Sequence, residues 1–296
     1  MAVLLVLLAF GVQVVLSVPL GILDVVFQNV LHRPSPNLER EPVLIGFINL
    51  VAFGAAVALG LYLNRLPLRR AFPIGRITAW QVIAVATTIL GMAVLLSEAD
   101  NLFRALLRPP QWLANMLKDL FFGENKLLSR IFLLVIIAPI TEELLFRGII
   151  LRGLLGRYRP AVAVALSAFL FAVIHANPWQ LLSAFFLGLV FGWFYLRTGS
   201  LLLCILAHAI ANGLSVICTL IPVSIPGLTS QPDYTVTAFQ PWWLDLSGLC
   251  VLLAGLWFFR HATPQTETSP EAAPPPSPPR ITEESNSAPS ATHPDG

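Results

Sequence analysis

Residues 136–150 read IIAPITEELLFRGII, a strongly apolar stretch that nevertheless contains Glu142, Glu143 and Arg147. It lies within a predominantly apolar segment from residue 129 to residue 154. The hydrocarbon core of a bilayer is about 30 Å thick, so about 20 apolar residues in a helix are enough to cross it. The segment is therefore predicted to span a membrane as a helix that carries charges inside it.

The composition of the whole chain agrees with a membrane protein. Of its 296 residues, 56% are hydrophobic and only 11% are charged, too few for the surface of a water-soluble domain of this size. The apolar stretches are continuous, whereas strands of a membrane β-barrel alternate apolar and polar residues. We predict an all-α polytopic membrane protein with about eight transmembrane helices, at residues 3–28, 43–63, 80–98, 129–154, 160–176, 179–196, 200–220 and 244–260.

Composition divides the chain into four segments. Residues 1–124 hold the N-terminal helices and a stretch, residues 100–126, that mixes aromatic and basic side chains and is equally well an amphipathic interfacial segment or an ordinary loop. Residues 125–220 form the central segment, and residues 221–262 a loop and the last helix. Residues 263–296 are rich in Pro, Ser and Glu and are predicted to be a disordered tail.

Basic residues in the connections predict the orientation of the chain in the membrane. Arginines fall in the second, fourth and sixth connections and after the last span, namely Arg65, Arg69, Arg70, Arg76, Arg157, Arg159, Arg197 and Arg260. With eight spans, the positive-inside rule then places both termini in the cytoplasm. A single short chain without an organelle signal fits a bacterial inner membrane, and the formal net charge of +2 gives no sign of a nucleic-acid partner.

The charges inside the fourth predicted span need an explanation. A charged side chain at the middle of a spanning helix costs about 2.5–3.5 kcal/mol on insertion scales, so it is usually paired or functional. Glu143 and Arg147 lie four residues apart on one helix face and are predicted to form a structural ion pair. Glu142 is rotated by about 100° from Glu143 around the helix. It has no charged partner in its own span and is the charge left to explain.

Polar side chains in two later spans are candidate partners for Glu142. The fifth span carries His175, and the seventh carries His208 with Asn212 four residues further on. A carboxylate can accept a proton from water, imidazoles can hold a metal ion or the attacking water, and an amide can donate to an oxyanion. Each taken alone could equally be an interhelical hydrogen bond. Cys204, four residues before His208, is more simply a packing residue than a metal ligand.

The predicted topology does not bring the two histidines together directly. His175 falls near the non-cytoplasmic end of its span, whereas His208 lies about 12 Å from the cytoplasmic start of its own span at the helical rise per residue. A tilt, a break at Pro178 or shifted span ends would have to place them at one depth.

Three short motifs carry a family resemblance. The sequences EELLFR (142–147), FAVIH (171–175) and HAIAN (208–212) resemble the motifs EExxxR, FxxxH and HxxxN of the CPBP intramembrane proteases, also called the Abi or CAAX prenyl protease 2 family. The motifs occur in order, each in a separate predicted span. The resemblance covers roughly residues 125–220, about a third of the chain, which would then be the protease core.

The resemblance implies an intramembrane endopeptidase that acts on a peptide or membrane-protein substrate in the lipid bilayer. It implies that Glu142 and His175 activate the attacking water and that His208 and Asn212 stabilise the oxyanion. A zinc ion held by Glu142, His175 and His208 is possible and is not established by the sequence. Other intramembrane protease chemistries find no support, because HExxH, GxSxG and GxGD are all absent from the sequence.

Two other functions remain open at this stage. A non-catalytic membrane scaffold or immunity-type binding protein could share the same motifs. An ion or proton transporter could use Glu142 and the histidines as a relay, since ionisable residues inside the membrane also mark such pathways.

Overall fold

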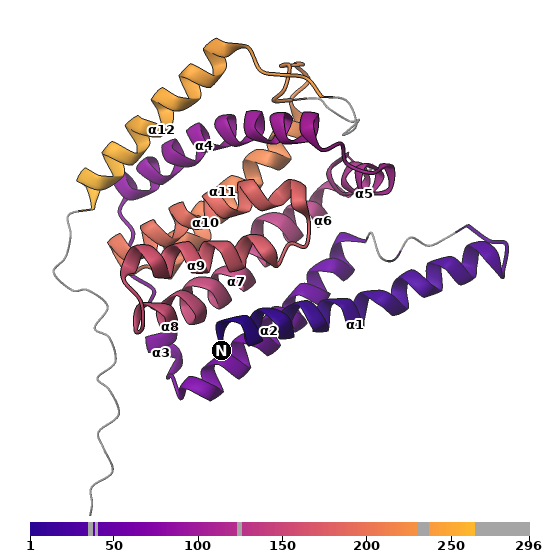
Figure 1. Cartoon of the computed structure of the whole chain (residues 1–296), viewed down its shortest axis with the longest axis horizontal. Coiled ribbons are helices and arrows are strands. Elements are labelled where there is room, and N and C mark those ends of the chain that lie inside the picture. Colours follow the sequence, from indigo (N-terminus) through magenta and orange to yellow (C-terminus); the bar gives the residue numbers. More distant parts are fainter. Residues whose placement is uncertain (35–37, 39–40, 123–125, 230–236, 264–296) are drawn as a thin grey trace, which may run out of the picture.

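The computed structural model describes residues 1–34, 38, 41–122, 126–229 and 237–263. Throughout these residues the chain forms helices and no strand, which confirms the predicted all-α membrane fold (Figure 1). Within them, six helices are long and apolar enough to cross a membrane: α1 (Ala2–Asn29), α2 (Pro42–Asn64), α4 (Ala79–Leu106), α10 (Pro178–Thr198), α11 (Leu201–Leu220) and α12 (Trp242–Ala262).

The fourth and fifth predicted spans differ from these six helices. The fifth is α9 (Pro160–Val173), which at 14 residues is shorter than a full crossing. The fourth is one helical rod in which α-helical and π-helical turns follow one another without a break. Its parts are α6 (Leu127–Ile131), η2 (Phe132–Ile137), α7 (Ala138–Glu143), η3 (Leu144–Leu151) and α8 (Arg152–Leu155).

A proline lies where the first π-helical part of this rod ends. The N–H of Ala138 donates to the carbonyl of Leu133, five residues back. At the same spacing the carbonyl of Leu134 would accept from residue 139, which is proline and has no N–H. The carbonyl of Leu134 therefore needs a donor from outside the rod, because an unsatisfied backbone group is costly in a membrane.

The segment predicted to lie in the interface is shorter than expected. Residues 100–106 continue α4 as helix, because no proline or glycine interrupts the chain before Pro109. The helix that follows is α5 (Gln111–Phe122), in which Leu113 and Ala114 are buried and Trp112 is exposed. Burial on one face with an exposed Trp is typical of an amphipathic helix at a membrane interface.

The helices are arranged in layers (Figure 1). The hairpin of α1 and α2 covers one side of the central rod, and α4 with α12 covers the opposite side, while α9, α10 and α11 lie between them. Glycines allow α4 and α12 to pack closely, since a Cβ at Gly91 would clash with the backbone of Leu252. The fourth span, α9, α10 and α11 thus form the centre of the molecule.

Contacts between connections place them at one end of the bundle. The N–H of Leu201 donates to the carbonyl of Pro73 at 3.0 Å, which joins the sixth connection to the second, where α3 (Leu68–Ala71) lies. Arg197 donates to the carbonyl of Thr263 at 2.5 Å, which joins the sixth connection to the end of α12. The second and sixth connections and the end of α12, which carry arginines, are therefore together. Their cytoplasmic orientation stays a prediction.

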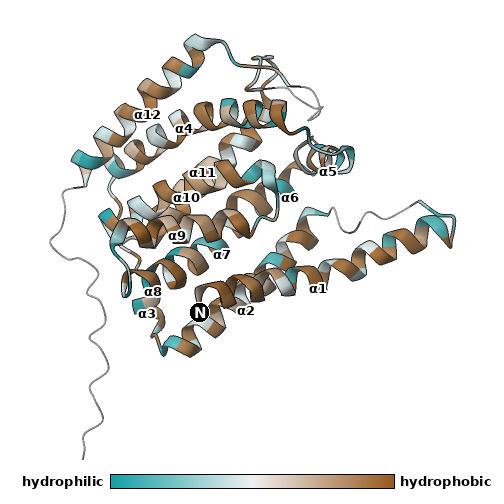
Figure 2. Ribbon diagram, viewed as in Figure 1, coloured by the Kyte–Doolittle hydropathy of each residue, from teal (hydrophilic) through white to brown (hydrophobic). Residues whose placement is uncertain are grey.

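Apolar side chains cover the outer faces of the helices (Figure 2). Large apolar residues on α1 and α12 are exposed, for example Val15 and Leu253. A face of this kind needs lipid rather than water around it. The predicted disordered tail lies outside the described residues apart from Thr263, which caps α12, and the predicted boundary at residue 124 lies outside them as well.

Candidate active site

The ion pair inside the rod is fully buried. Arg147 Nη1 donates to Glu143 Oε1 at 2.9 Å, and neither side chain has any exposed surface. Arg147 Nη2 donates to the carbonyl of Gly188 in α10 at 2.9 Å. The guanidinium carbon also lies 4.9 Å from the ring centre of Phe171 and 5.4 Å from that of Phe191. These contacts offset the cost of burying the guanidinium charge.

Glu143 also contacts a residue of the proposed site. Its Oε1 lies 3.0 Å from Nδ1 of His208. A carboxylate paired with arginine can only accept, so His208 Nδ1 must carry the hydrogen. The Nε2 atom of His208 then faces the interior of the site, and the ring of Phe191 stacks on the imidazole with centroids 5.2 Å apart. Glu143 therefore fixes both the arginine and the orientation of His208.

His175 is held in the same way by a backbone carbonyl. Its Nδ1 lies 2.8 Å from the carbonyl oxygen of Phe171, which only accepts, so this nitrogen also carries the hydrogen. The residue follows the end of α9, where Ala176 adopts a positive φ of 48° and Asn177 caps α10 through its side chain. The Nε2 atom of His175 is left free to act as an acceptor or ligand.

Glu142 lies between the two free imidazole nitrogens. Its Oε2 is 4.0 Å from Nε2 of His175 and 3.9 Å from Nε2 of His208. Both distances are too long for a direct hydrogen bond. The same Oε2 is buried and has no hydrogen-bond partner among the described residues. A buried polar atom in this state calls for a water molecule or an ion, and gaps of this size are those that one water can bridge.

The short α9 explains how the two histidines reach one carboxylate. At about 1.5 Å per residue, 14 helical residues extend about 21 Å, less than the thickness of the hydrocarbon core. The end of α9 therefore lies inside the membrane rather than at its far surface. His175 comes directly after this end and can approach the depth of His208. The sequence offered no clear signal for this early ending, because residues up to 174 continue the apolar pattern.

The three groups around this point, Glu142, His175 and His208, are all able to act as acceptors, and we call them the triad. A neutral water has two hydrogens and satisfies two acceptors, so the third needs a cation, either a proton on one ring or a metal ion. A carboxylate oxygen and two imidazole nitrogens are ligands that zinc accepts. Each histidine is also held at its other ring nitrogen by a hydrogen-bond acceptor, as is usual for histidines that bind zinc. In the described part of the chain, however, no group of three or more His, Cys, Asp or Glu side chains forms a ready metal site.

The spacing within the triad explains that finding. Zinc ligands lie about 2.0–2.1 Å from the metal and so about 3.3 Å from one another in a tetrahedral site. The carboxylate oxygen would have to approach both rings by several tenths of an ångström from its distances of 3.9 and 4.0 Å. Cys204 is no part of the triad, since its sulfur donates to the carbonyls of Phe191 and Ser200.

Asn212 is engaged with the rod. Its Nδ2 donates to the carbonyl of Leu134 at 2.8 Å, which is the carbonyl that Pro139 leaves without a backbone donor. The interhelical hydrogen bond considered for this residue on sequence grounds is thus present. One N–H of the amide remains for another acceptor.

Sequence reasoning missed the residues that support the triad. The carbonyl of Gly188 and the rings of Phe171 and Phe191 hold Arg147 and both imidazoles in place. Phe171 is part of the FAVIH motif, and its i,i+4 spacing to His175 is visible in the sequence, whereas its contact with Arg147 is not. Phe191 and Gly188 belong to a helix without any charged residue near them, and no pattern in the sequence marks their role.

Comparisons with known proteins agree with the motifs. Residues 124–214 match the family described as type II CAAX prenyl endopeptidase Rce1-like. YdiL of Bacillus subtilis (strain 168), a predicted membrane peptidase, is 35% identical over 88 residues, which cover 30% of this chain and 36% of YdiL. The UPF0177 protein YxdF of Lactococcus lactis subsp. lactis (strain IL1403) is 31% identical over 91 residues, which cover 30% of this chain and 50% of YxdF.

The matches cover only part of this chain and of its relatives. The chain spans half or less of the length of the two relatives. No solved structure is significantly similar to it. The matched residues include the whole triad, whereas α1, α2, α4 and α12 lie outside them. The predicted family resemblance is confirmed for the segment that carries the candidate site.

Proposed function

We propose that the chain is an intramembrane endopeptidase, because residues 124–214 match the family described as type II CAAX prenyl endopeptidase Rce1-like. The observation that carries the proposal is the buried Oε2 of Glu142, which lacks a hydrogen-bond partner among the described residues and lies 4.0 and 3.9 Å from two imidazole nitrogens. A group placed in this way is ready to bind a water molecule. The Oε2 atom of Glu143 also lacks a partner in the described part of the chain, but Oε1 of that residue is engaged by Arg147 and His208, whereas Glu142 has two imidazole nitrogens at water-bridging distance and no direct bond to either.

Glu142 is proposed to act as the general base. It takes one proton from the water while His175 Nε2 accepts the other hydrogen and orients the oxygen. The oxygen attacks the carbonyl carbon of the scissile peptide bond and gives a tetrahedral oxyanion. Protonated Glu142 then returns its proton to the departing amine, so that one water is consumed and a carboxyl group and an amine are formed.

His208 is proposed to carry the proton that the triad needs. Glu143 lies at its Nδ1 and stabilises a positive ring, so Nε2 can donate to the oxyanion. The remaining N–H of Asn212 is a second candidate donor. Glu143 and Arg147 act through His208 and are positioning residues. A zinc ion bound by Glu142, His175 and His208 would in its place supply a Lewis acid that polarises the water and the carbonyl.

The wider setting of the reaction is also proposed. We infer a peptide or membrane-protein substrate that reaches the triad from the bilayer, in a bacterial inner membrane with both termini of the chain in the cytoplasm. This orientation rests on the arginines of the connections, of which the second and sixth and the end of α12 contact one another.

The test is cleavage of a fluorogenic peptide panel by the purified protein in detergent. Glu142→Gln and His175→Ala should abolish hydrolysis, while Glu41→Gln, a carboxylate at the surface paired with Lys126, should not. Loss of activity on chelation and its return with zinc would assign the cation to a metal. Full activity in the presence of the chelator would assign it to a proton on His208. Equal cleavage by wild type and Glu142→Gln, or none by wild type on any peptide, would contradict the proposal.

A further inference from the structure

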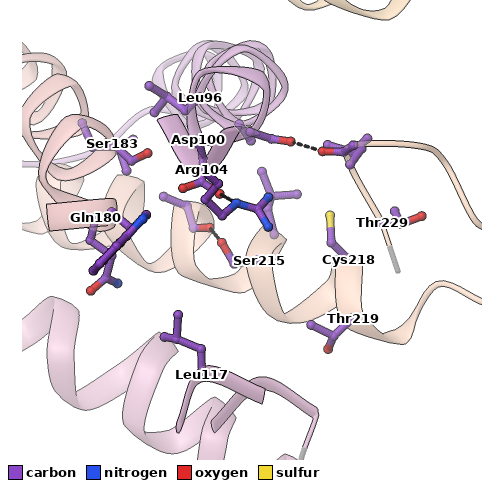
Figure 3. A pocket seen from close by; sticks show the side chains of 18 of the residues that line it. Leu96, Asp100, Arg104, Leu117, Gln180, Ser183, Ser215, Cys218, Thr219 and Thr229 are labelled. Carbon is purple, nitrogen blue, oxygen red and sulfur yellow. Dashed lines mark hydrogen bonds and ion pairs between the residues drawn. The ribbon is translucent and has the colours of Figure 1, made fainter. Parts of the chain in front are cut away.

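A cavity of about 330 Å³ lies between α4, α5, α10, α11 and residues 227–229 (Figure 3). Its volume is at the lower end of the range of about 300–1,000 Å³ found for ligand pockets. None of the triad residues forms part of its wall. The cavity is therefore a separate feature whose relation to the candidate active site has to be established from the helices that they share.

Two helices connect the cavity to the triad. In α10, Leu187 lines the cavity, and Phe191, four residues later on the same face, stacks on the ring of His208. In α11, Ala211 lines the cavity and lies three residues after His208, which places the two on neighbouring faces less than one turn apart. Residues that line the cavity therefore lie within about one helical turn of His208 or of the ring that stacks on it.

The wall of the cavity combines apolar surface with a few hydrogen-bonding groups. Asp100 and Arg104 also line the cavity, and leucines and an isoleucine contribute apolar surface, namely Ile89, Leu96, Leu117, Leu187, Leu214 and Leu228. Ser183 points toward the cavity, and its hydroxyl makes no hydrogen bond that is found among the described residues (Figure 3). The hydroxyls of Ser215 and Thr219 donate to carbonyls of their own helix, so their lone pairs remain as acceptors.

This mixture favours a peptide over a lipid chain as the occupant. A peptide backbone brings N–H and C=O groups that need an acceptor and a donor, and the wall offers both. A hydrocarbon chain brings none and would leave the hydroxyl of Ser183 unsatisfied.

Residues 227–229, which line the cavity, are hydrogen-bonded to α4. The carbonyl of Gly227 accepts from Ser97 Oγ and from Asn101 Nδ2, each at 2.8 Å. Gly227 has a φ of 72°, which glycine adopts without strain. Beside it, Arg104 pairs with Asp100 at 2.9 Å.

We propose that this cavity is the subsite for an apolar side chain of the substrate next to the scissile bond, with Ser183 donating to the peptide backbone. The inference rests on the proposed endopeptidase function and adds a determinant of specificity to it. The wall from α4 and residues 227–229 lies outside the residues matched to the family. Selection of the substrate is thus assigned partly to segments outside the matched residues and partly to α10 and α11 within them.

The first experiment fills the cavity. Ala93 lines it from α4, and Ala105 is an exposed residue of the same helix, so Ala93→Phe and Ala105→Phe form a matched pair. Across peptides that differ only in carrying Ala or Phe near the cleaved bond, Ala93→Phe should lower kcat/KM for the Phe peptides roughly tenfold or more and spare the Ala peptides. Ser183→Ala should raise KM for both. Unchanged selectivity in Ala93→Phe, with wild-type cleavage intact, would overturn the subsite and leave the proposed function standing.

The second experiment does not depend on cleavage. Cys218 lines the cavity, Cys204 is fully buried, and Cys250 is exposed and is removed as Cys250→Ser. In this variant combined with Glu142→Gln, a Phe-containing peptide should slow modification of Cys218 by methyl methanethiosulfonate, measured by mass spectrometry. An unchanged rate, or slowing by a long-chain fatty acid and not by the peptide, would overturn the proposal. If the peptide protects Cys218 but the wild-type protein cleaves no peptide, the proposed hydrolysis would be contradicted and the subsite would stand.

Discussion

Pro139 and Asn212 are complementary although they lie in different helices. Pro139 removes the N–H that the carbonyl of Leu134 would accept at π-helical spacing, and Asn212 Nδ2 supplies a hydrogen to that carbonyl at 2.8 Å. Neighbouring helices commonly satisfy the backbone groups that a proline frees in a membrane. The hydrogen bond joins α11 to the rod that carries Glu142.

This relationship predicts that the two residues are energetically coupled. Asn212→Ala leaves the Leu134 carbonyl without its donor and should destabilise the protein by roughly 0.6–1.7 kcal/mol, the range measured for interhelical hydrogen bonds in membranes. In a Pro139→Ala background the backbone N–H is restored, so the same change should cost less. Unfolding of the four variants in mixed micelles gives the cycle. Equal costs in both backgrounds would show that Asn212 does not serve the carbonyl that Pro139 frees.

The buried pair of Glu143 and Arg147 should be far more sensitive than the pair at the surface. Glu143→Gln leaves Arg147 without a counter-charge at zero exposure, and breaking a buried pair costs about 3–5 kcal/mol. Glu41→Gln breaks the pair with Lys126, whose side chain is 37% exposed, and should cost no more than about 1 kcal/mol. The comparison is made by thermal unfolding in one detergent. Similar losses in the two variants would contradict the assigned role of Glu143.

Gly188 and Gly213 should respond in opposite ways to the same substitution. A Cβ at Gly188 would lie 3.0 Å from Ala168 and 3.3 Å from the ring of Phe171, so Gly188→Ala should force α9 away from α10. Because Phe171 holds His175, kcat should fall with stability. A Cβ at Gly213 would meet nothing within 4 Å, and Gly213→Ala should stabilise α11 by about 0.5–1 kcal/mol. A neutral Gly188→Ala variant would argue against the close approach of α9 and α10.

The helical segments could be predicted because a bilayer demands long apolar helices. The described residues have a helical segment at each of the eight predicted spans, and six of these are single helices long and apolar enough to cross a membrane. The pairing of Glu143 with Arg147 follows from spacing within one helix, and the two atoms lie 2.9 Å apart. Local spacing and hydrophobicity are properties of a single segment. These features can therefore be predicted from each segment of the sequence taken alone.

The features that escaped prediction depend on contacts between segments. The bond of Glu143 to His208 joins residues 65 positions apart, and the early end of α9 places His175 beside Glu142. Neither has a local pattern. Apolar character also runs through the π-helical turns without a change, so the hydropathy that located the fourth span could not show its geometry. The catalytic roles of the triad and Asn212 stay predictions.

Substitutions of Glu142 should separate catalysis from stability. Its Oε2 has no hydrogen-bond partner to lose among the described residues, and a buried unpaired carboxylate is itself unfavourable. Glu142→Gln should therefore keep or raise the free energy of unfolding while it lowers kcat by about 10²–10⁴, the usual contribution of a general base. Glu142→Asp retains a base but draws it back by about 1.5 Å, one carbon–carbon bond, and should fall between Gln and wild type in kcat.

The informative measurement pairs kcat with unfolding for all three proteins. A base predicts that activity follows wild type, Asp, Gln in falling order, while stability does not follow that order. If Glu142 serves the fold instead, the stability of both variants should fall together with kcat, because each variant would lose a contact that the wild-type side chain makes. Coincident losses of kcat and stability in Glu142→Gln would therefore assign Glu142 to the fold and would remove the water-activating role from the triad.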